Sequence, residues 1–242
     1  MSTRAEMLDH VRKALGRPQT GSVVTPLSPL DLEGVMPSLA PQDYQAKFEM
    51  EWEKVAGIAY QVSRMEELES VLQKILVPAE TSTIALSRNP IIKQLGIADW
   101  LMAHKKVATS WANFAGIASA DSSLADFNKA SFAAGAGITG VDWVLAESGT
   151  LVLSSVTEGA QVASLAPPIH IALYRRSQLV GSLDEVLAKL AISSSPDRPT
   201  PGRAVVFITG TSRTADIEQI LVRGVHGPRE VYAILVEDSC RR

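Results

Sequence analysis

The sequence predicts an α/β fold, with an open, mostly parallel sheet flanked by helices. Short apolar or β-branched runs bounded by turn residues recur along the chain, which is typical of buried strands. Helix-length segments lie between these runs, so that strand and helix alternate repeatedly. The composition, with 46% hydrophobic and 20% charged residues, can bury a sizeable core. We therefore expect one main domain in this chain of 242 residues.

The expected strands are apolar runs of four to six residues: Ala59 to Val62, Thr83 to Ser87, Lys106 to Ser110, Ile169 to Tyr174, Ala204 to Thr209 and Val231 to Val236. The expected helices are a segment with Tyr44, Phe48, Trp52 and Val55 on one face, then Glu66 to Leu76, Ile91 to Ala103, Leu183 to Leu190 and Asp216 to Val222. Between Val141 and Ser155 two strand-like arms flank a tight turn, which predicts a strand-turn-strand unit.

The N-terminal part differs from the rest in pattern. Leu8, Val11 and Leu15 recur at helical spacing, so residues 2 to 15 are predicted to form a short amphipathic helix. Five prolines follow, which indicates an extended linker: Pro18, Pro26, Pro29, Pro37 and Pro41. We expect residues 1 to 40 to hold the helix and linker, and residues 41 to 242 to form the α/β domain.

Charge and cysteine content argue against several functions. A formal net charge of -3 and no long basic block give no general attraction to nucleic acid. The charged N-terminus does not resemble a signal peptide, and no segment has 18 uninterrupted apolar residues, so we expect a cytoplasmic protein without a membrane span. With Cys240 as its only cysteine, the chain has no internal disulfide and too few thiolates for an iron-sulfur cluster. The four histidines are scattered, so no metal site is expected.

The turn at Glu147-Ser148-Gly149-Thr150 is the first candidate site. Glu147 has the chemistry of a base, a nucleophile or a hydrogen-bond acceptor, while the Ser148 and Thr150 hydroxyls are suited to position an oxyanion. The alternative is a hairpin turn with a solvated glutamate. The glycine-spaced run that begins at Gly135 leads into a strand rather than a helix, which argues against NAD binding.

His170 is the second candidate. It follows a double proline at the start of an apolar strand, where it is suited to carry a proton. A lone histidine between isoleucines is also typical of a sheet residue with one satisfied nitrogen. Both readings stay open.

The third candidate is the loop with Gly210, Ser212, Arg213 and Thr214, which follows an apolar strand and precedes a predicted helix. Ligands of open α/β sheets collect at strand carboxyl ends, and a helix N-terminus with an arginine favours a small anionic ligand. Alternatively, Thr214 only caps that helix.

The fourth candidate is the turn with His226 and Arg229 before the last strand. If that strand neighbours the strand at 204 to 209, His226 and Arg229 approach the loop with Arg213. The alternative is an ordinary turn.

Four stretches together resemble the LUD-domain family of the lactate-utilisation protein C type. They are Gly140-Val-Asp-Trp-Val-Leu-Ala-Glu-Ser-Gly-Thr-Leu-Val-Leu, Ser164-Leu-Ala-Pro-Pro-Ile-His-Ile, Thr214-Ala-Asp-Ile-Glu and Val225-His-Gly-Pro-Arg, and the resemblance spans residues 41 to 238. At Thr211 the pattern would have proline. The resemblance implies a fold similar to the sugar-phosphate isomerase and CoA-transferase group. It also implies partner proteins with iron-sulfur clusters, in a system that converts L-lactate to pyruvate.

We therefore expect a subunit of a lactate (2-hydroxy acid) oxidation system that binds no cofactor itself and works with iron-sulfur partner proteins. One alternative is an independent enzyme that acts on an acyl-CoA, a sugar phosphate or a folate-like anion, with Glu147 as its central carboxylate. Another is a sensor or scaffold that binds an anion without catalysis.

Overall fold

The computed structural model describes residues 3–14, 39–111, 120–193, 204–214, 222–224 and 226–240. The chain divides into two units, Met1–Ser38 and Leu39–Arg242. In the first unit the described element is α1 (Arg4–Ala14), which lies within the helix predicted for residues 2 to 15. Most of the predicted proline-rich linker lies outside the described residues.

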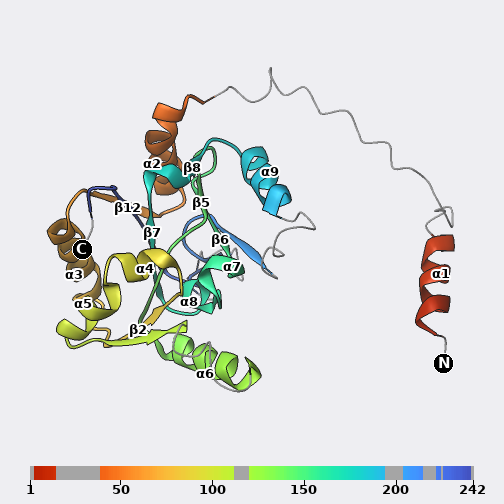
Figure 1. Ribbon diagram of the computed structural model, residues 1–242, viewed down its shortest axis with the longest axis horizontal. Coiled ribbons are helices and arrows are strands. Elements are labelled where there is room, and N and C mark those ends of the chain that lie inside the picture. Colours follow the sequence, from red (N-terminus) through yellow and green to blue (C-terminus); the bar gives the residue numbers. More distant parts are fainter. Residues whose placement is uncertain are drawn as a thin grey trace. The chain divides into compact units, whose positions relative to one another are not determined.

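A six-stranded sheet forms the centre of the second unit (Figure 1). Its strands, in spatial order, are β1 (Ile58–Val62), β12 (Glu230–Val236), β7 (Ile169–Tyr174), β4 (Ala136–Thr139), β2 (Thr83–Leu86) and β3 (Val107–Ser110). All five neighbouring pairs run parallel. The sheet confirms the predicted α/β class.

The neighbouring interior strands β7 and β12 are buried along almost their whole length because both faces of the sheet are covered. They pair in parallel from Ile169 beside Glu230 to Tyr174 beside Leu235. Both runs were predicted to be strands, which the structure confirms.

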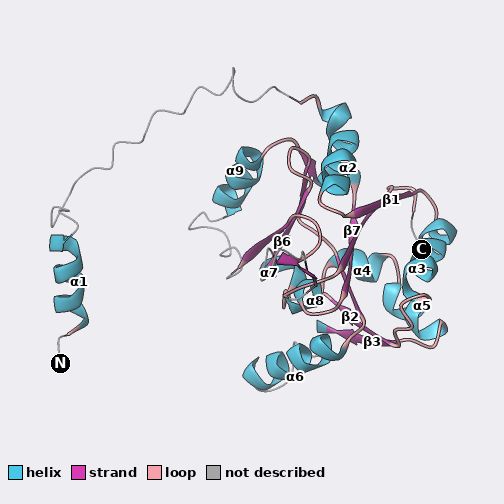
Figure 2. Ribbon diagram, turned by 180° about the vertical axis from the view of Figure 1, so that it is seen from behind, coloured by secondary structure: helices cyan, strands magenta, loops and turns pink. Residues whose placement is uncertain are grey.

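Three helices cover one face of the sheet: α3 (Met65–Leu76), α4 (Pro90–Gln94) and α5 (Ile97–Ala103) (Figure 2). Helix α3 buries Leu68, Leu72 and Leu76 and carries glutamates in its first turn, where they favour the helix dipole. The prediction of a single helix from Ile91 to Ala103 is wrong. Gly96, in a left-handed conformation with φ of 58°, divides it into α4 and α5.

The second face is covered by α2 (Tyr44–Lys54) and by a smaller sheet. In spatial order this sheet contains β8 (Leu179–Val180), β5 (Trp143–Leu145), β6 (Thr150–Ser154) and β9 (Val205–Ile208). Strands β5 and β6 are antiparallel, which confirms the predicted strand-turn-strand unit. Phe48, Trp52 and Tyr174 form an aromatic cluster between α2 and the large sheet.

The remaining elements are α6 (Ala120–Ala133), α7 (Ser155–Glu158), α8 (Val162–Leu165), α9 (Leu183–Ser193), the 3-10 turns Pro41–Asp43 and Arg176–Gln178, and the short pair β10 (Arg213–Thr214) and β11 (Val222–Arg223). Val222 belongs to β11, so the predicted helix from Asp216 to Val222 is wrong at that end, and residues 216–221 lie outside the described residues.

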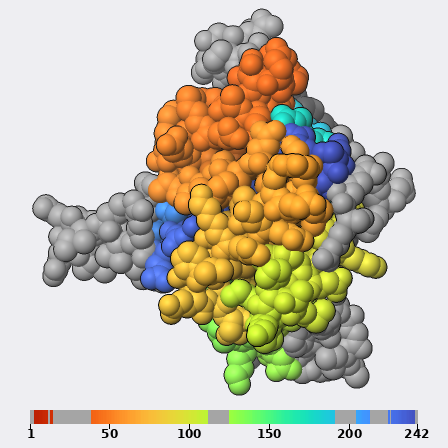
Figure 3. Space-filling model, turned by 90° about the vertical axis from the view of Figure 1, so that its left-hand side faces the viewer, coloured from red at the N-terminus to blue at the C-terminus, as the bar shows by residue number. Residues whose placement is uncertain are grey.

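The edges of the large sheet are β1 and β3. Figure 3 shows the face on which α2, β1 and α3 gather, in orange. Among the described residues no helix is long and apolar enough to cross a membrane.

Candidate functional site

The strand order creates a switch point between β2 and β4. From β2 the chain passes outward to β3, at one edge, and then returns to the other side of β2 to form β4, followed by β7 and β12. In open α/β sheets the crevice at the carboxyl ends of two such strands is the usual place for a ligand. The residues that follow β2 and β4 therefore define the candidate site.

The loop after β2 is built around Asn89. Its side-chain oxygen accepts a hydrogen bond from Ile91 N at 3.1 Å, which caps α4, and Pro90 occupies the first helical position. Asn89 N donates to Ser87 Oγ at 3.3 Å. A side chain at Gly140, the first residue after β4, would overlap the Asn89 amide. The two loops therefore lie in direct contact.

Glu158, the last residue of α7, lies between these loops and is 1% exposed. Asn89 Nδ2 donates to its Oε1, Gly140 N donates to its Oε2 at 3.2 Å, and Ser87 makes a further side-chain hydrogen bond. Burial outweighs these bonds and raises the pKa of Glu158 to about 7. A carboxyl group that titrates near neutral pH at a switch point is a mark of functional sites.

Asp142, two residues after Gly140, holds α7 in place. It accepts hydrogen bonds from Ser154 N at 2.6 Å and from Thr157 Oγ1 at 2.8 Å. Its own pKa is raised by burial, and its charge contributes to the raised pKa of Glu158. The two carboxyl groups are therefore electrostatically coupled.

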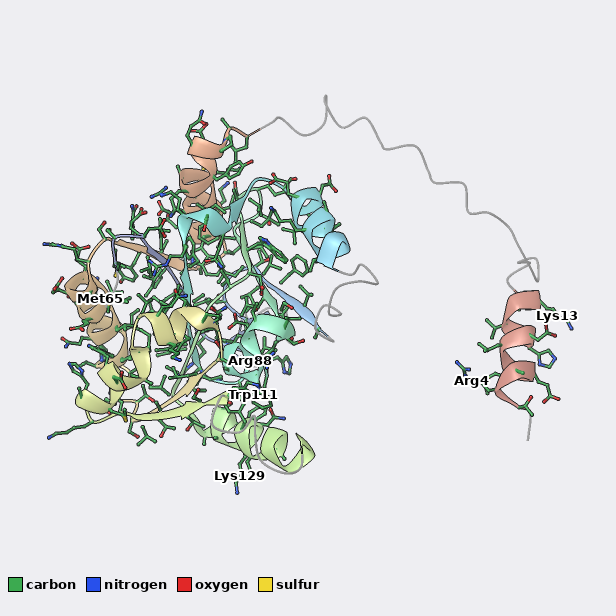
Figure 4. The ribbon with its side chains drawn as sticks, in the orientation of Figure 1. Arg4, Lys13, Met65, Arg88, Trp111 and Lys129 are labelled. Atoms are coloured by element: carbon green, nitrogen blue, oxygen red, sulfur yellow. The ribbon has the colours of Figure 1, made fainter. Side chains whose placement is uncertain are left out.

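Arg88 and Trp111 both border α7 (Figure 4). The exposed Arg88 side chain donates to Val156 O at 2.5 Å, and no described ion pair includes it. Trp111 follows β3 and packs against Gly159, and its indole Nε1 is buried without a hydrogen-bond partner in the described structure. A cation and an unpartnered donor thus lie beside the Glu158 network.

This arrangement is suited to a small anion that also carries a hydroxyl or carbonyl group. A guanidinium binds a carboxylate with two parallel hydrogen bonds, and the indole N–H donates to an oxygen. Both oxygens of Glu158 already accept hydrogen bonds, so its part is to position Asn89 and the Gly140 loop. Among the described residues no cluster of three His, Cys, Asp or Glu side chains is placed to hold a metal ion.

Comparison with known proteins identifies the family. The model of the LUD domain matches residues 45–236, which is most of the chain. The chain belongs to the LUD domain family. A crystal structure of a DUF162 family protein from Deinococcus radiodurans has a similar fold, with a TM-score of 0.55, 23% identity, and coverage of 82% of this chain and 99% of that one.

Several relatives are named "Lactate utilization protein C". The Halalkalibacterium halodurans protein is 42% identical over 102 residues, which are 42% of this chain and 44% of that protein. The Bacillus subtilis protein is 38% identical over 105 residues, 43% of each chain. These matches therefore span less than half of the relatives. The Bacillus pumilus protein is 25% identical over 99% of this chain and 98% of its own length.

In this LUD domain the turn at Glu147 joins two other elements. Glu147 Oε1 accepts a hydrogen bond from Leu183 N at 2.7 Å, at the start of α9. The Ser148 and Thr150 hydroxyls are hydrogen-bonded at 2.8 Å, and Thr150 is hydrogen-bonded to Thr209, beside Gly210. Gly149 packs on the backbone of α2. Part of the Glu147 carboxylate is thus used to cap a helix, and its catalytic role stays a prediction.

His170 is fully buried on β7, where its Nε2 is hydrogen-bonded to Thr139 Oγ1 at 2.9 Å. Burial lowers the pKa of His170 to about 3, so the imidazole is neutral at physiological pH. Its Nδ1 has no hydrogen-bond partner in the described structure. These features fit a sheet residue with one satisfied nitrogen, and a role as proton carrier stays a prediction.

The condition set for the fourth candidate, that the last strand neighbours the strand at 204–209, is not met. Strand β12 lies between β1 and β7, while β9 pairs with β6 in the small sheet. The two loops nevertheless meet, because Ser212 N donates to Pro228 O at 3.0 Å. The exposed His226 and Arg229 flank Pro228, so they lie beside the loop of Gly210 and Ser212.

This second group lies at the amino edge of the large sheet. Arg229 N donates to Pro168 O at 2.8 Å, just before β7, and Thr211 N donates to Val55 O, just before β1. Arg213 and Thr214 form strand β10. Their side chains and residues 215–221 lie outside the described ones, so the predicted cap at Thr214 stays a prediction. Their predicted ligand-binding roles, and those of their neighbours, stay predictions.

The sequence analysis missed the site at the carboxyl edge. The signal available was Ser87-Arg-Asn-Pro directly after a predicted strand, because polar residues at that point are the usual ligand contacts. Glu158 gave no such signal. It lies 18 residues after Gly140 in the sequence, and only the position of the short helix α7 brings its carboxylate to the Gly140 loop.

Proposed function

We propose that this LUD-domain chain takes part in lactate utilisation, as a subunit of a lactate (2-hydroxy acid) oxidation system that works with iron-sulfur partner proteins. The observation that supports this role most directly is its similarity to the Bacillus pumilus lactate utilization protein C over 99% of the chain. One cysteine, Cys240, is too few to hold an iron-sulfur cluster, so the iron-sulfur centres of the system belong to the partners.

The carboxyl-edge site supports a small 2-hydroxy or 2-oxo acid as the ligand. The exposed Arg88 supplies the charge complement for its carboxylate. In this proposal the Trp111 ring shifts on binding, so that its Nε1, buried without a partner among the described residues, donates to the hydroxyl or keto oxygen. Conversion of a hydroxyl to a keto group releases two electrons and two protons. In this proposal the two electrons pass to an iron-sulfur partner and the two protons to solvent, while this chain binds and orients the acid.

Binding to the chain alone tests the ligand. L-lactate and pyruvate are titrated into the purified protein by calorimetry, and into two variants that each remove one exposed cation, Arg88→Gln and Lys129→Gln. Loss of a charged hydrogen bond should weaken binding about tenfold or more in Arg88→Gln. Lys129, on α6, should behave like the unchanged protein. Equal affinity in all three proteins would place the ligand elsewhere.

Activity tests the subunit role. Dye-linked L-lactate oxidation is measured without oxygen for this chain, for the candidate iron-sulfur partners, and for the complete mixture. Activity only in the complete mixture supports a required subunit. Equal activity without this chain contradicts the proposal, whatever the result of the binding experiment.

A further inference from the structure

Strand β1 has one open side. Among the described residues its only strand partner is β12, and Val62 O accepts a hydrogen bond from Glu237 N at 2.9 Å on that side. In a parallel ladder alternate residues bond to the same neighbour. Because Val62 bonds to the β12 side, Ala59 and Gln61 direct their backbone N–H and C=O groups to the open side.

Nothing in the strand itself blocks a further strand. Natural edge strands are protected by lysine, proline, a bulge or a covering element. Strand β1 reads Ile-Ala-Tyr-Gln-Val and has neither lysine nor proline, and Ile58 is 41% exposed.

A hollow lies on each face of this edge. One, of about 510 Å³, is lined by Glu49 and Glu53 of α2 and by residues 56–61. The other, of about 390 Å³, is lined by Glu66, Glu67, Ser70 and Val71 of α3 and by residues 61–62. Side chains of a strand alternate between the two faces of its sheet. A strand added at β1 would therefore place successive side chains in the two hollows alternately.

The negative charge that lines the two hollows favours a positively charged partner. Their linings hold four carboxylates and no lysine or arginine. Arg64 pairs with Glu67 at 2.7 Å, and Lys74 lies over the Tyr60 ring, but no described ion pair includes Glu53 or Glu66. A second copy of this chain would bring the same carboxylates against each other, whereas a basic segment complements them.

We propose that the open edge of β1 binds an extended, lysine- or arginine-bearing segment of another protein as a seventh strand of the large sheet. Main-chain hydrogen bonds to Ala59 and Gln61 supply the pairing, and the carboxylates on both faces select the basic side chains. The edge is independent of the lactate site, so this proposal stands or falls separately from the proposed function.

The probes are two capped peptides of about eight residues. In one, pairs of lysines alternate with pairs of valines, so that lysines fall on both faces of the added strand, and in the other glutamates replace the lysines. Each is labelled and titrated with the full chain, and binding is followed by fluorescence anisotropy. Amide hydrogen exchange is measured with and without peptide. The lysine peptide should bind and should slow exchange at Ala59 and Gln61, while the amides of β3 at the other edge stay unchanged.

A matched pair of double variants tests the charge. Glu53→Gln with Glu66→Gln removes one carboxylate from each hollow, and Asp126→Asn with Asp184→Asn removes two exposed carboxylates from α6 and α9. The first pair should weaken lysine-peptide binding about fivefold, and the second should leave it unchanged. Equal binding of both peptides, equal loss in both double variants, or unchanged exchange at Ala59 and Gln61 would overturn the proposal. So would a dimer in which these amides are protected without peptide, because the occupant would then be a second copy.

Discussion

Asn89 links Glu158 to the start of α4. Its amide nitrogen donates to Glu158 Oε1, and its amide oxygen accepts from Ile91 N. One side chain thus caps a helix after β2 and satisfies a buried carboxyl group at the end of α7. This double role makes the carboxyl edge sensitive to substitution at Asn89.

Asn89→Ala should lower the free energy of unfolding by about 2–4 kcal/mol, because it removes a helix cap and leaves a buried carboxyl oxygen without its donor. Urea unfolding at neutral pH measures this change. Ser154→Ala is the matched control, since the Ser154 hydroxyl caps α7 by accepting from Val156 N. It should cost about 1 kcal/mol. Equal losses in the two variants would mean that the bond to Glu158 adds nothing.

Glu158 should make the protein less stable as pH rises from about 4.5 to about 7, because the folded state keeps a proton that the unfolded state has already released. The full cost, present above the folded pKa, is about 3 kcal/mol. Glu158→Gln removes this titration, although its amide cannot accept both native hydrogen bonds. Its stability relative to the unchanged protein should therefore improve as pH rises, and a constant difference across this range would contradict a raised pKa.

His170 should make the protein less stable as pH falls, which is the opposite of the effect of Glu158. Its folded pKa of about 3 lies below the ordinary 6.5, so the unfolded state takes up a proton first and stability falls as pH drops from 6.5 toward 3. The loss approaches about 5 kcal/mol at the acid end. His170→Gln, which keeps a polar contact for Thr139, should flatten this acid limb. Between pH 4.5 and 6.5 Glu158 and His170 change the free energy of unfolding in opposite directions as pH varies. Urea unfolding of each variant across this range is therefore needed to separate the two contributions.

Gly149→Ala should destabilise the fold by about 3 kcal/mol. The backbone at Gly149 has a φ of 60°, and an added Cβ would lie 2.5 Å from Trp52 N, which is backbone and cannot swing away. At Gly227 an added Cβ would lie 3.2 Å from Ser212 Cβ, and φ is not positive, so Gly227→Ala should cost less than about 1 kcal/mol. Thermal unfolding of the two variants compares them, and similar midpoints would show that the turn adjusts.

Strands rich in large apolar or β-branched side chains were predictable even when short, but a strand of small side chains was not. The predicted strand from Ile169 to Tyr174 has the observed bounds because apolar content and flanking prolines define it. Strand β4 was missed because its four residues, Ala136–Thr139, include two small side chains in a glycine-rich run. Gly137 is needed there because a Cβ would lie 1.8 Å from Ala163 O of α8, which is a tertiary contact with no local sign.

The sequence by itself determined the α/β class, the apolar runs that form β7 and β12, the hairpin at Glu147 and the absence of enough cysteines for a cluster. These depend on periodicity, composition and turn residues, which are local properties. Only the tertiary structure decided that Glu158, Asn89 and Gly140 meet at the switch point and that Ser212 meets Pro228. Strand order decides such contacts, and it arises from the packing of distant segments on a shared core, which a local pattern does not encode.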